Sequence, residues 1–157
     1  MALKRVSETG QNVMTPARLL AMLNALNRVI DALLGDITDL SGTYTPTGTN
    51  VLNLSASTPL AAQYIRVGNM VFVTGEFEAT PTATGECKLG LSLPIASALT
   101  ARSQLAGGAE CITPFSTNGR QAAVYGDATN NRAEVHWYAD DNGIGRAWSY
   151  SYGYQIL

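Results

Sequence analysis

Residues 15–40 read TPARLLAMLNALNRVIDALLGDITDL, and this stretch decides the architecture that the sequence predicts. Its apolar residues are spaced alternately four and three apart, which is the heptad pattern of a coiled coil. The a and d positions are Leu19, Leu23, Leu26, Ile30, Leu33, Ile37 and Leu40. Thr15 and Pro16 are typical of a helix N-cap and first helical position. We therefore expect a helix from Pro16 to at least Leu34, ending by Ser41.

The positions beside this heptad seam bear on the number of helices. Isoleucine at a with leucine at d favours a coiled coil of two helices. The flanking e and g positions, however, include the apolar residues Leu20, Leu34, Met22 and Val29 where a dimer usually carries charges. A wide apolar stripe favours three or more helices, so we expect a homotrimer. The alternative is a helix packed on the β-domain of its own chain.

From Gly42 onward the apolar period changes from helical to two, and turn signals such as Gly68-Asn69 are frequent. This pattern predicts an antiparallel, jelly-roll-like β-sandwich over residues 42–157. The expected strands are Val51–Ser55, Gln63–Val67, Met70–Ala79, Cys87–Leu93, Gln104–Cys111, Gln121–Tyr125, Arg132–Ala139 and Ala147–Ile156.

Alternation along the strands also predicts which side chains form the core, because successive residues of a strand point to opposite faces. The expected core residues are Val71, Val73, Phe77, Ala79, Leu89, Leu91, Leu93, Ala133, Val135 and Trp137.

Composition excludes several classes of protein. The net charge of −2 and pI of about 5.3 favour neither nucleic acid nor an anionic membrane as a partner. No apolar run is long enough to span a bilayer, and residues 1–5 lack the apolar core of a signal peptide. Only 14% of residues are charged, which suggests that sister chains cover part of the surface. Cys87 and Cys111 are expected to be free buried thiols, with a disulfide as the alternative.

The sequence offers little for catalysis. His136 is the only histidine and lies on the polar face of its strand, which argues against a multi-histidine metal site or a catalytic triad. Glu76 and Glu78 share a strand face, but exposed acids of this kind are usually only solvated. The acidic turn at 140–142 lacks the distal glutamate of a calcium loop. We expect no catalytic residue, metal or cofactor, and hence no enzyme.

One strand has the character of a site. Trp148, Tyr150, Tyr152 and Tyr154 alternate with small residues, so one sheet face carries four aromatic side chains. Such a row can stack on sugar rings. It can equally form the core or a contact between subunits.

From Tyr44 onward the chain resembles a phage virion domain found in small tail-fibre, tailspike-tip and head-fibre proteins. The resemblance covers about 110 residues and rests on four segments: residues 44–47, residues 63–69 with Val71, Val73 and Gly75, residues 89–95, and residues 150–156. It implies a homotrimer with a C-terminal β-sandwich and an N-terminal segment that docks on the virion. It implies no catalytic residues.

The sequence thus predicts a short virion fibre, made in the host cytoplasm, with three parts. Residues 1–14 are expected to form an arm that anchors the protein to a larger capsid or tail component. Residues 15–41 form the trimeric coiled coil, and residues 42–157 form the head that attaches to the host surface, with a glycan as one candidate ligand. One alternative is a head fibre or capsid decoration protein without a dedicated receptor. Another is a glycan depolymerase.

Overall fold

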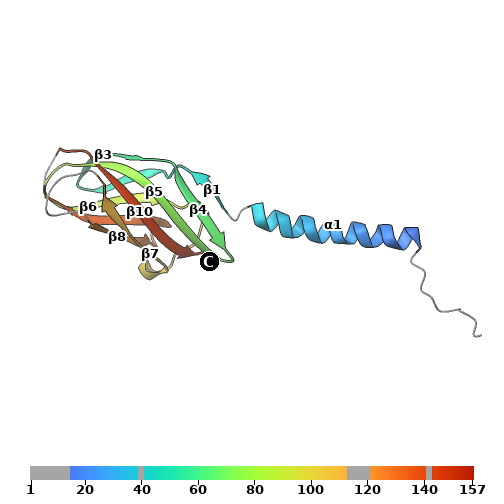
Figure 1. Cartoon of the computed structure of the whole chain (residues 1–157). Helices are drawn as coiled ribbons and strands as arrows, with labels where there is room; N and C mark the ends of the chain where they lie inside the picture. Colours follow the sequence, from blue (N-terminus) through green and yellow to red (C-terminus); the bar gives the residue numbers. More distant parts are fainter. Residues whose placement is uncertain (1–14, 39–40, 113–120, 141–142) are drawn as a thin grey trace, which may run out of the picture. The chain divides into compact units, whose positions relative to one another are not determined.

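A computed structural model of the chain describes residues 15–38, 41–112, 121–140 and 143–157, with the side chains of residues 31–38 left out. The chain divides into two units, one ending at Thr38 and the other following it. Among the described residues, the first unit contains a single helix, and the second, called the head here, contains ten strands (Figure 1).

Helix α1 extends over Pro16–Thr38, as the heptad pattern predicts. Thr15 caps it: the Arg18 backbone N–H donates to Thr15 Oγ1 over 3.3 Å, and the Leu19 N–H donates to the Thr15 carbonyl over 3.0 Å. These bonds satisfy backbone donors that have no partner within the first turn of a helix. The predicted N-cap is therefore confirmed.

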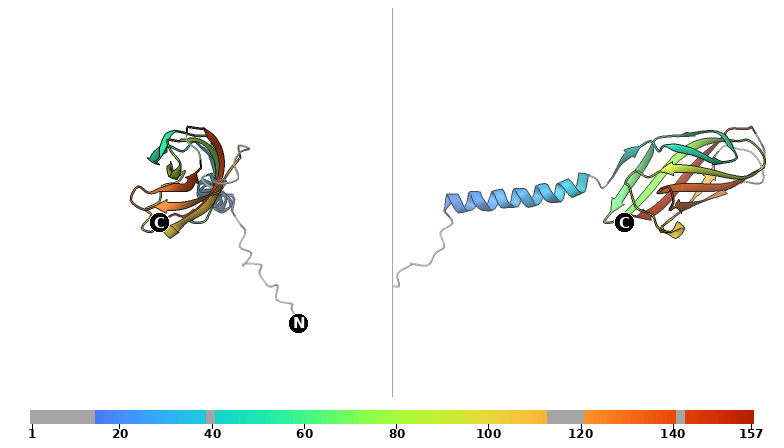
Figure 2. Two further views of the ribbon diagram at one scale, coloured as in Figure 1. Left: turned by 90° about the vertical axis from the view of Figure 1, so that its left-hand side faces the viewer. Right: turned by 180° about the vertical axis from the view of Figure 1, so that it is seen from behind.

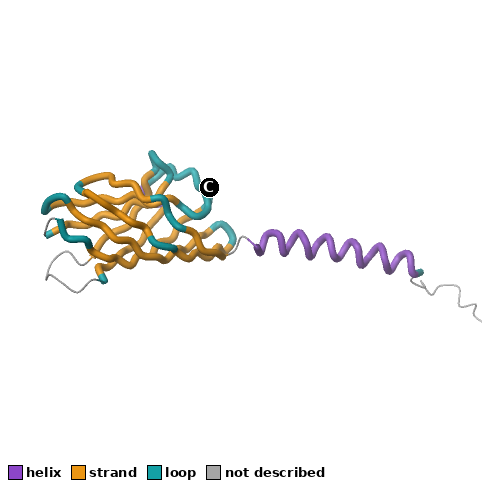
Figure 3. The backbone as a smooth tube through the Cα atoms, turned by 90° about the horizontal axis from the view of Figure 1, so that it is seen from above, coloured by secondary structure: helices purple, strands orange, loops and turns teal. Residues whose placement is uncertain are grey.

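The head is built from antiparallel strands that join in one continuous sheet. Along the sheet the order is β1-β4-β5-β10-β7-β8-β9-β6-β2, and β3 pairs with the second half of β5. The strands lie alongside one another over the length of the head (Figure 3). Their bounds are β1 Ser41–Tyr44, β2 Gly48–Leu52, β3 Leu54–Pro59, β4 Ala62–Val67, β5 Met70–Pro81, β6 Gly85–Ser92, β7 Leu105–Cys111, β8 Gln121–Asp127, β9 Arg132–Ala139 and β10 Arg146–Gln155, with a short 3₁₀ helix η1 at Arg102–Gln104 before β7.

The sheet curls round so that its inner face encloses the core (Figure 2, left). The ring of Phe77 on β5 lies 6.0 Å from that of Trp137 on β9, although three strands separate β5 and β9 in the sheet. The side chain of Asn50 on β2 bonds to Ser57 and to the Leu54 carbonyl of β3, so the outermost strand β2 meets β3. The predicted core residues are buried, except that Leu93 is half-buried against them.

The sequence prediction was wrong in two places near the start of the head. Ser41 and Gly42, the predicted end of the helix, belong to strand β1, and the predicted strand Val51–Ser55 is broken in two. Asn53 interrupts it with a φ of 55°, a conformation that asparagine tolerates better than most residues. Its side-chain oxygen accepts bonds from Thr82 Oγ1 (2.6 Å) and the Ala83 N–H (2.9 Å), which fixes this turn against the β5–β6 turn.

The first strand of the head begins, and the last strand ends, at the same end of the domain. The β4–β5 hairpin turns at Gly68, whose φ of +62° suits a tight turn, as predicted. Ser41 pairs with Ile65 beside this turn, and Gln155 pairs with Met70. The Asn53, β5–β6 and β9–β10 turns lie at the other end of the strands.

Candidate functional site

The apolar stripe of α1 is exposed along its described length. The exposed fractions of its a and d side chains range from 40% at Ile30 to 54% at Leu26. The flanking residues Leu20, Met22 and Val29 are 56–60% exposed, so the stripe is as wide as the sequence predicts. Large apolar side chains arranged on one helix face at this exposure are typical of a surface that binds other helices.

The second half of the predicted seam is less fully described. The backbone at Leu33 and Ile37 is helical, but their side chains are not described, and Leu40 lies outside the described residues. Residues 1–14, the predicted virion anchor, also lie outside them. The trimer and the anchor stay predictions.

The aromatic row of β10 lies in the core of its own head. Trp148, Tyr150, Tyr152 and Tyr154 are 0–3% exposed. Trp148 stacks on Phe77 with ring centroids 6.1 Å apart, and Tyr150 stacks on Tyr152 at 5.8 Å. These four residues thus form part of the core, which is one of the alternatives that the sequence left open, because the curled sheet turns that face inward.

Hydrogen bonds among the tyrosines fix the position of this row. The hydroxyls of Tyr44 and Tyr152 lie 3.0 Å apart, and Tyr154 Oη donates to the Ile95 carbonyl over 2.6 Å. Burial raises the pKa values of Tyr150 and Tyr152 well above the usual range, and that of Tyr154 to about 12. These tyrosines therefore act as neutral packing and hydrogen-bonding groups at physiological pH.

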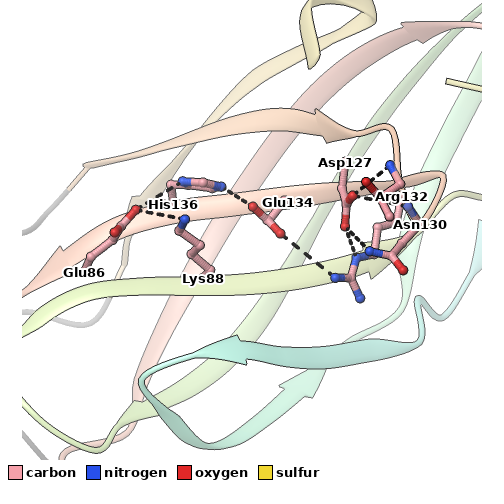
Figure 4. A network of polar contacts seen from close by, with 8 residues as sticks. Glu86, Lys88, Asp127, Asn130, Arg132, Glu134 and His136 are labelled. Atoms are coloured by element: carbon pink, nitrogen blue, oxygen red, sulfur yellow. Dashed lines mark hydrogen bonds and ion pairs between the residues drawn. The ribbon is translucent and has the colours of Figure 1, made fainter. Parts of the chain in front are cut away.

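A row of charged side chains crosses β6 and β9 on the outside of the sheet (Figure 4). Arg132 lies between two carboxylates, with Nε 2.8 Å from Asp127 Oδ2 and Nη2 4.0 Å from Glu134 Oε2. His136 follows, with Nε2 on Glu134 Oε1 and Nδ1 3.6 Å from Glu86 Oε1. Lys88 completes the row, 3.3 Å from Glu86. We call this set the charged row.

The charged row is held firmly in place. The side chains of Asp127, Arg132, Glu134 and His136 are only 11–18% exposed. A side chain at Gly90, beside Arg132, would place its Cβ 2.7 Å from the guanidinium, so glycine leaves room for the arginine. The placement of His136 beside Arg132 and Glu134 confirms the predicted strand face. Because these groups bond to one another, the row ties β6 to β9.

Asp127 is the anchoring acid of this row. Partial burial opposes its charge, but hydrogen bonds from Asn130 and Arg132 outweigh that effect and lower the pKa of the carboxyl. Its Oδ1 also accepts the backbone N–H groups of Thr129 and Asn130 in the β8–β9 turn. The acid thus stabilises both the turn and the row.

A second surface, which we call the apolar face, lies on the outside of β4 and β5. It consists of Ile65, Val67, Met70 and Phe72, whose side chains are 37–61% exposed. Sequence reasoning missed this face, although a signal was available: Met70 and Phe72 alternate with the predicted core residues of their strand and yet are apolar. Glu76 and Glu78 are also exposed further along β5.

The described residues give no sign of a metal centre. No group of three or more histidine, cysteine or acidic side chains among them is arranged to hold a metal ion. Cys87 is buried, Cys111 is half-buried, and neither forms a disulfide. Burial raises the pKa of the Cys87 thiol, which makes it less reactive. Among the described residues, no helix is long and apolar enough to cross a membrane.

Comparison with known proteins gave one similar structure. No family model matches the chain, and no curated protein matches it. The chain is similar to the receptor binding protein (gp15) of Listeria phage PSA, known from its crystal structure, with 23% sequence identity and a TM-score of 0.41. The similarity covers 81% of this chain and 77% of that one. A likeness at this level establishes neither a shared fold nor a shared partner.

Proposed function

We propose that the chain is a structural protein of a phage virion: a short homotrimeric fibre whose coiled coil carries a jelly-roll-like β-sandwich for attachment to the host surface. One observation carries the proposal. The head has a buried apolar core of its own, whereas the heptad stripe of α1 is 40–60% exposed and fits sister helices. The motifs of the head that resemble phage fibre domains support the same function.

Three heads on one coiled coil suit attachment to a repetitive surface. A trimer binds such a surface through several weak contacts at once, which raises the apparent affinity without new contacts in any head. Residues 1–14 are our candidate for the anchor on the capsid or tail. We propose no catalytic activity, because the acids of the charged row are paired and Glu76 and Glu78 lie on an open strand face.

A capsid decoration protein without a dedicated receptor is the second candidate. The burial of Trp148, Tyr150, Tyr152 and Tyr154 favours it, since the row that could have stacked on sugars is unavailable. This observation bears on the choice of ligand and leaves the virion location unchanged.

The proposal is tested on the purified full chain and on particles of the phage or prophage that encodes it. Light scattering should give three times the 16.6 kDa mass of one chain. Antibody fragments raised against the protein should label the particles, and an excess of protein should reduce adsorption of those particles to host cells. A monomeric mass or unlabelled particles would overturn the fibre. Labelled particles whose adsorption is unaffected would select the decoration protein.

Enzymatic activity needs its own assay. The protein is incubated with host polysaccharide and the release of reducing ends is measured. We expect no release above that of heat-denatured protein, and sustained release would select the depolymerase instead.

A further inference from the structure

The apolar face adjoins an uncharged hollow that is lined from five strands of the head. The hollow has a volume of about 620 Å³ and is lined from β1, β4, β5, β7 and β10. Phe72 forms part of its wall, and small residues such as Ala106, Ser151 and Gly153 form its floor. None of its lining residues, all within the described chain, carries a charge. A surface of this composition suits a protein partner better than a charged or strongly polar ligand.

The register of the sheet places this face next to the beginning of the head. Ser41 pairs with Ile65, Ile65 pairs with Phe72, and Phe72 pairs with Gly153. Since neighbouring strands lie about 4.8 Å apart, Ile65 and Phe72 are about 5 and 10 Å from Ser41. The exposed side chains are therefore close to the point where the head begins.

The length of chain between α1 and β1 limits how far apart three heads can be. Helix α1 ends at Thr38 and β1 begins at Ser41, and three residue steps span at most about 11 Å. Helices in a bundle lie about 8–10 Å apart. In a coiled coil of three chains, the three copies of Ser41 are thus held close to the common axis. The apolar faces beside them are the parts of the heads nearest to one another.

On these grounds we propose that the apolar face binds a second copy of this chain: Ile65 and Phe72 of each head contact the heads of the sister chains around the trimer axis. This inference rests on the proposed trimer and extends the subunit interface from the helix to the head. The low charge of the chain agrees with it, because a covered surface needs fewer charged side chains to stay in solution. The charged row on β9 then remains outside the interface.

The test is cross-linking of single-cysteine additions in the full chain. Phe72→Cys is compared with Tyr138→Cys, a matched aromatic control on β9 that is 66% exposed. Each variant is treated with a short bis-maleimide, and the products are separated on a denaturing gel. The wild-type chain gives the background from Cys87 and Cys111. Ile65→Cys serves as a second variant in case the loss of the Phe72 ring weakens the contact.

We expect covalent dimers from Phe72→Cys or Ile65→Cys at least tenfold above those from Tyr138→Cys and from wild type. Equal or weaker cross-linking than the control, in a protein whose native mass is that of a trimer, would overturn this interface and leave the fibre proposal standing. A monomeric mass would overturn both. The two failures are therefore distinguishable in one set of samples.

Discussion

Leucine side chains are exposed on the helix and buried in the head. Leu89, Leu91 and Leu105 of the head have no exposed surface, whereas Leu23 and Leu26 of the helix are 48% and 54% exposed. Burying a leucine side chain contributes about 1.5–3 kcal/mol. The head therefore gains stability within one chain, and under the proposed trimer the helix gains comparable stability from the sister helices.

This difference predicts that the helix and the head unfold independently. Isolated helices of this length are marginal in water, because forming the first turn is costly and few tertiary contacts compensate. The head has a buried core of its own, so we expect it to fold without the contacts of the helix. Each substitution below is expected to affect one of the two units and to leave the other unchanged.

The largest effect is expected for Leu26→Asp combined with Ile30→Asp. Two charges in the seam of every chain remove the apolar contacts between helices, so the native mass should fall threefold and helical circular dichroism should decrease. The thermal transition of the head should persist. Asn24→Asp, on the opposite side of the helix, is the matched control and should stay trimeric. Loss of the head transition together with the trimer would contradict separate folding.

Phe77→Ala should be the most damaging single change in the head. Phe77 is fully buried and touches Trp137, Trp148 and Tyr150, and removal of such a ring costs about 3–5 kcal/mol. Urea unfolding should show this loss. Tyr138→Ala, an exposed control, should change the free energy of unfolding by less than about 0.5 kcal/mol. Similar losses in both variants would show that the core assignment is wrong.

Gly75→Ala probes how closely the tyrosine row approaches β5. An added Cβ would lie 2.6 Å from Tyr150 Oη and 2.7 Å from the Ala62 Cβ, and overpacking of this kind costs about 1–3 kcal/mol. Tyr150→Phe removes the hydroxyl and should recover part of the loss. Gly108→Ala is the control, because its nearest neighbour would lie at an ordinary 3.6 Å. A tolerated Gly75→Ala would place the tyrosine elsewhere.

The buried tyrosines predict instability of the head in alkali. Their folded-state pKa values are raised, so their contribution is complete below pH 10, the ordinary tyrosine value, and is lost as the pH rises through the folded values. The free energy of unfolding should fall by about 1.4 kcal/mol per pH unit for each such tyrosine above pH 10. Tyr152→Phe should reduce this slope, as measured by urea unfolding between pH 9 and about pH 11. An unchanged slope would mean that Tyr152 ionises normally.

The smallest effect is expected at the charged row. The pKa of Asp127 is lowered, so the stabilisation it provides is present above the ordinary value of about 3.9 and is lost as the pH falls through the folded value. Asp127→Asn should lower the free energy of unfolding by about 1 kcal/mol at pH 7. The difference from wild type should disappear near pH 2–3, where the acid is protonated in both states. Glu78→Gln, on an exposed strand face, is the control and should show no such convergence.

The sequence predicts local structure well where the cause is local. Thr15 and Pro16 begin the helix as their types indicate, and strict alternation identifies the inner faces of β5, β6 and β9. Asn53 escaped prediction because its left-handed conformation is stabilised by Thr82 and Ala83, which are distant in sequence.

The candidate sites depend more on tertiary structure. The aromatic row was ambiguous because alternation shows that four side chains share a face, not whether the sheet closes over that face. The charged row could not be predicted without knowing that β6, which carries Glu86 and Lys88, pairs with β9. This strand order is set by packing of the whole sheet. The apolar face could have been predicted from Ile65 and Phe72, because they are apolar residues on the outer face of their strands.

Ser41 and Gln155 lie at one end of the head, and this position determines where the sequence of the head can vary. The turns at the opposite end, including the one fixed by Asn53, connect strands that are already paired over their length. Insertions or replacements there would alter the surface shown at that end without displacing the strand that follows the helix. The domain is therefore a scaffold whose turns at that end can be replaced while the strand after the helix keeps its position.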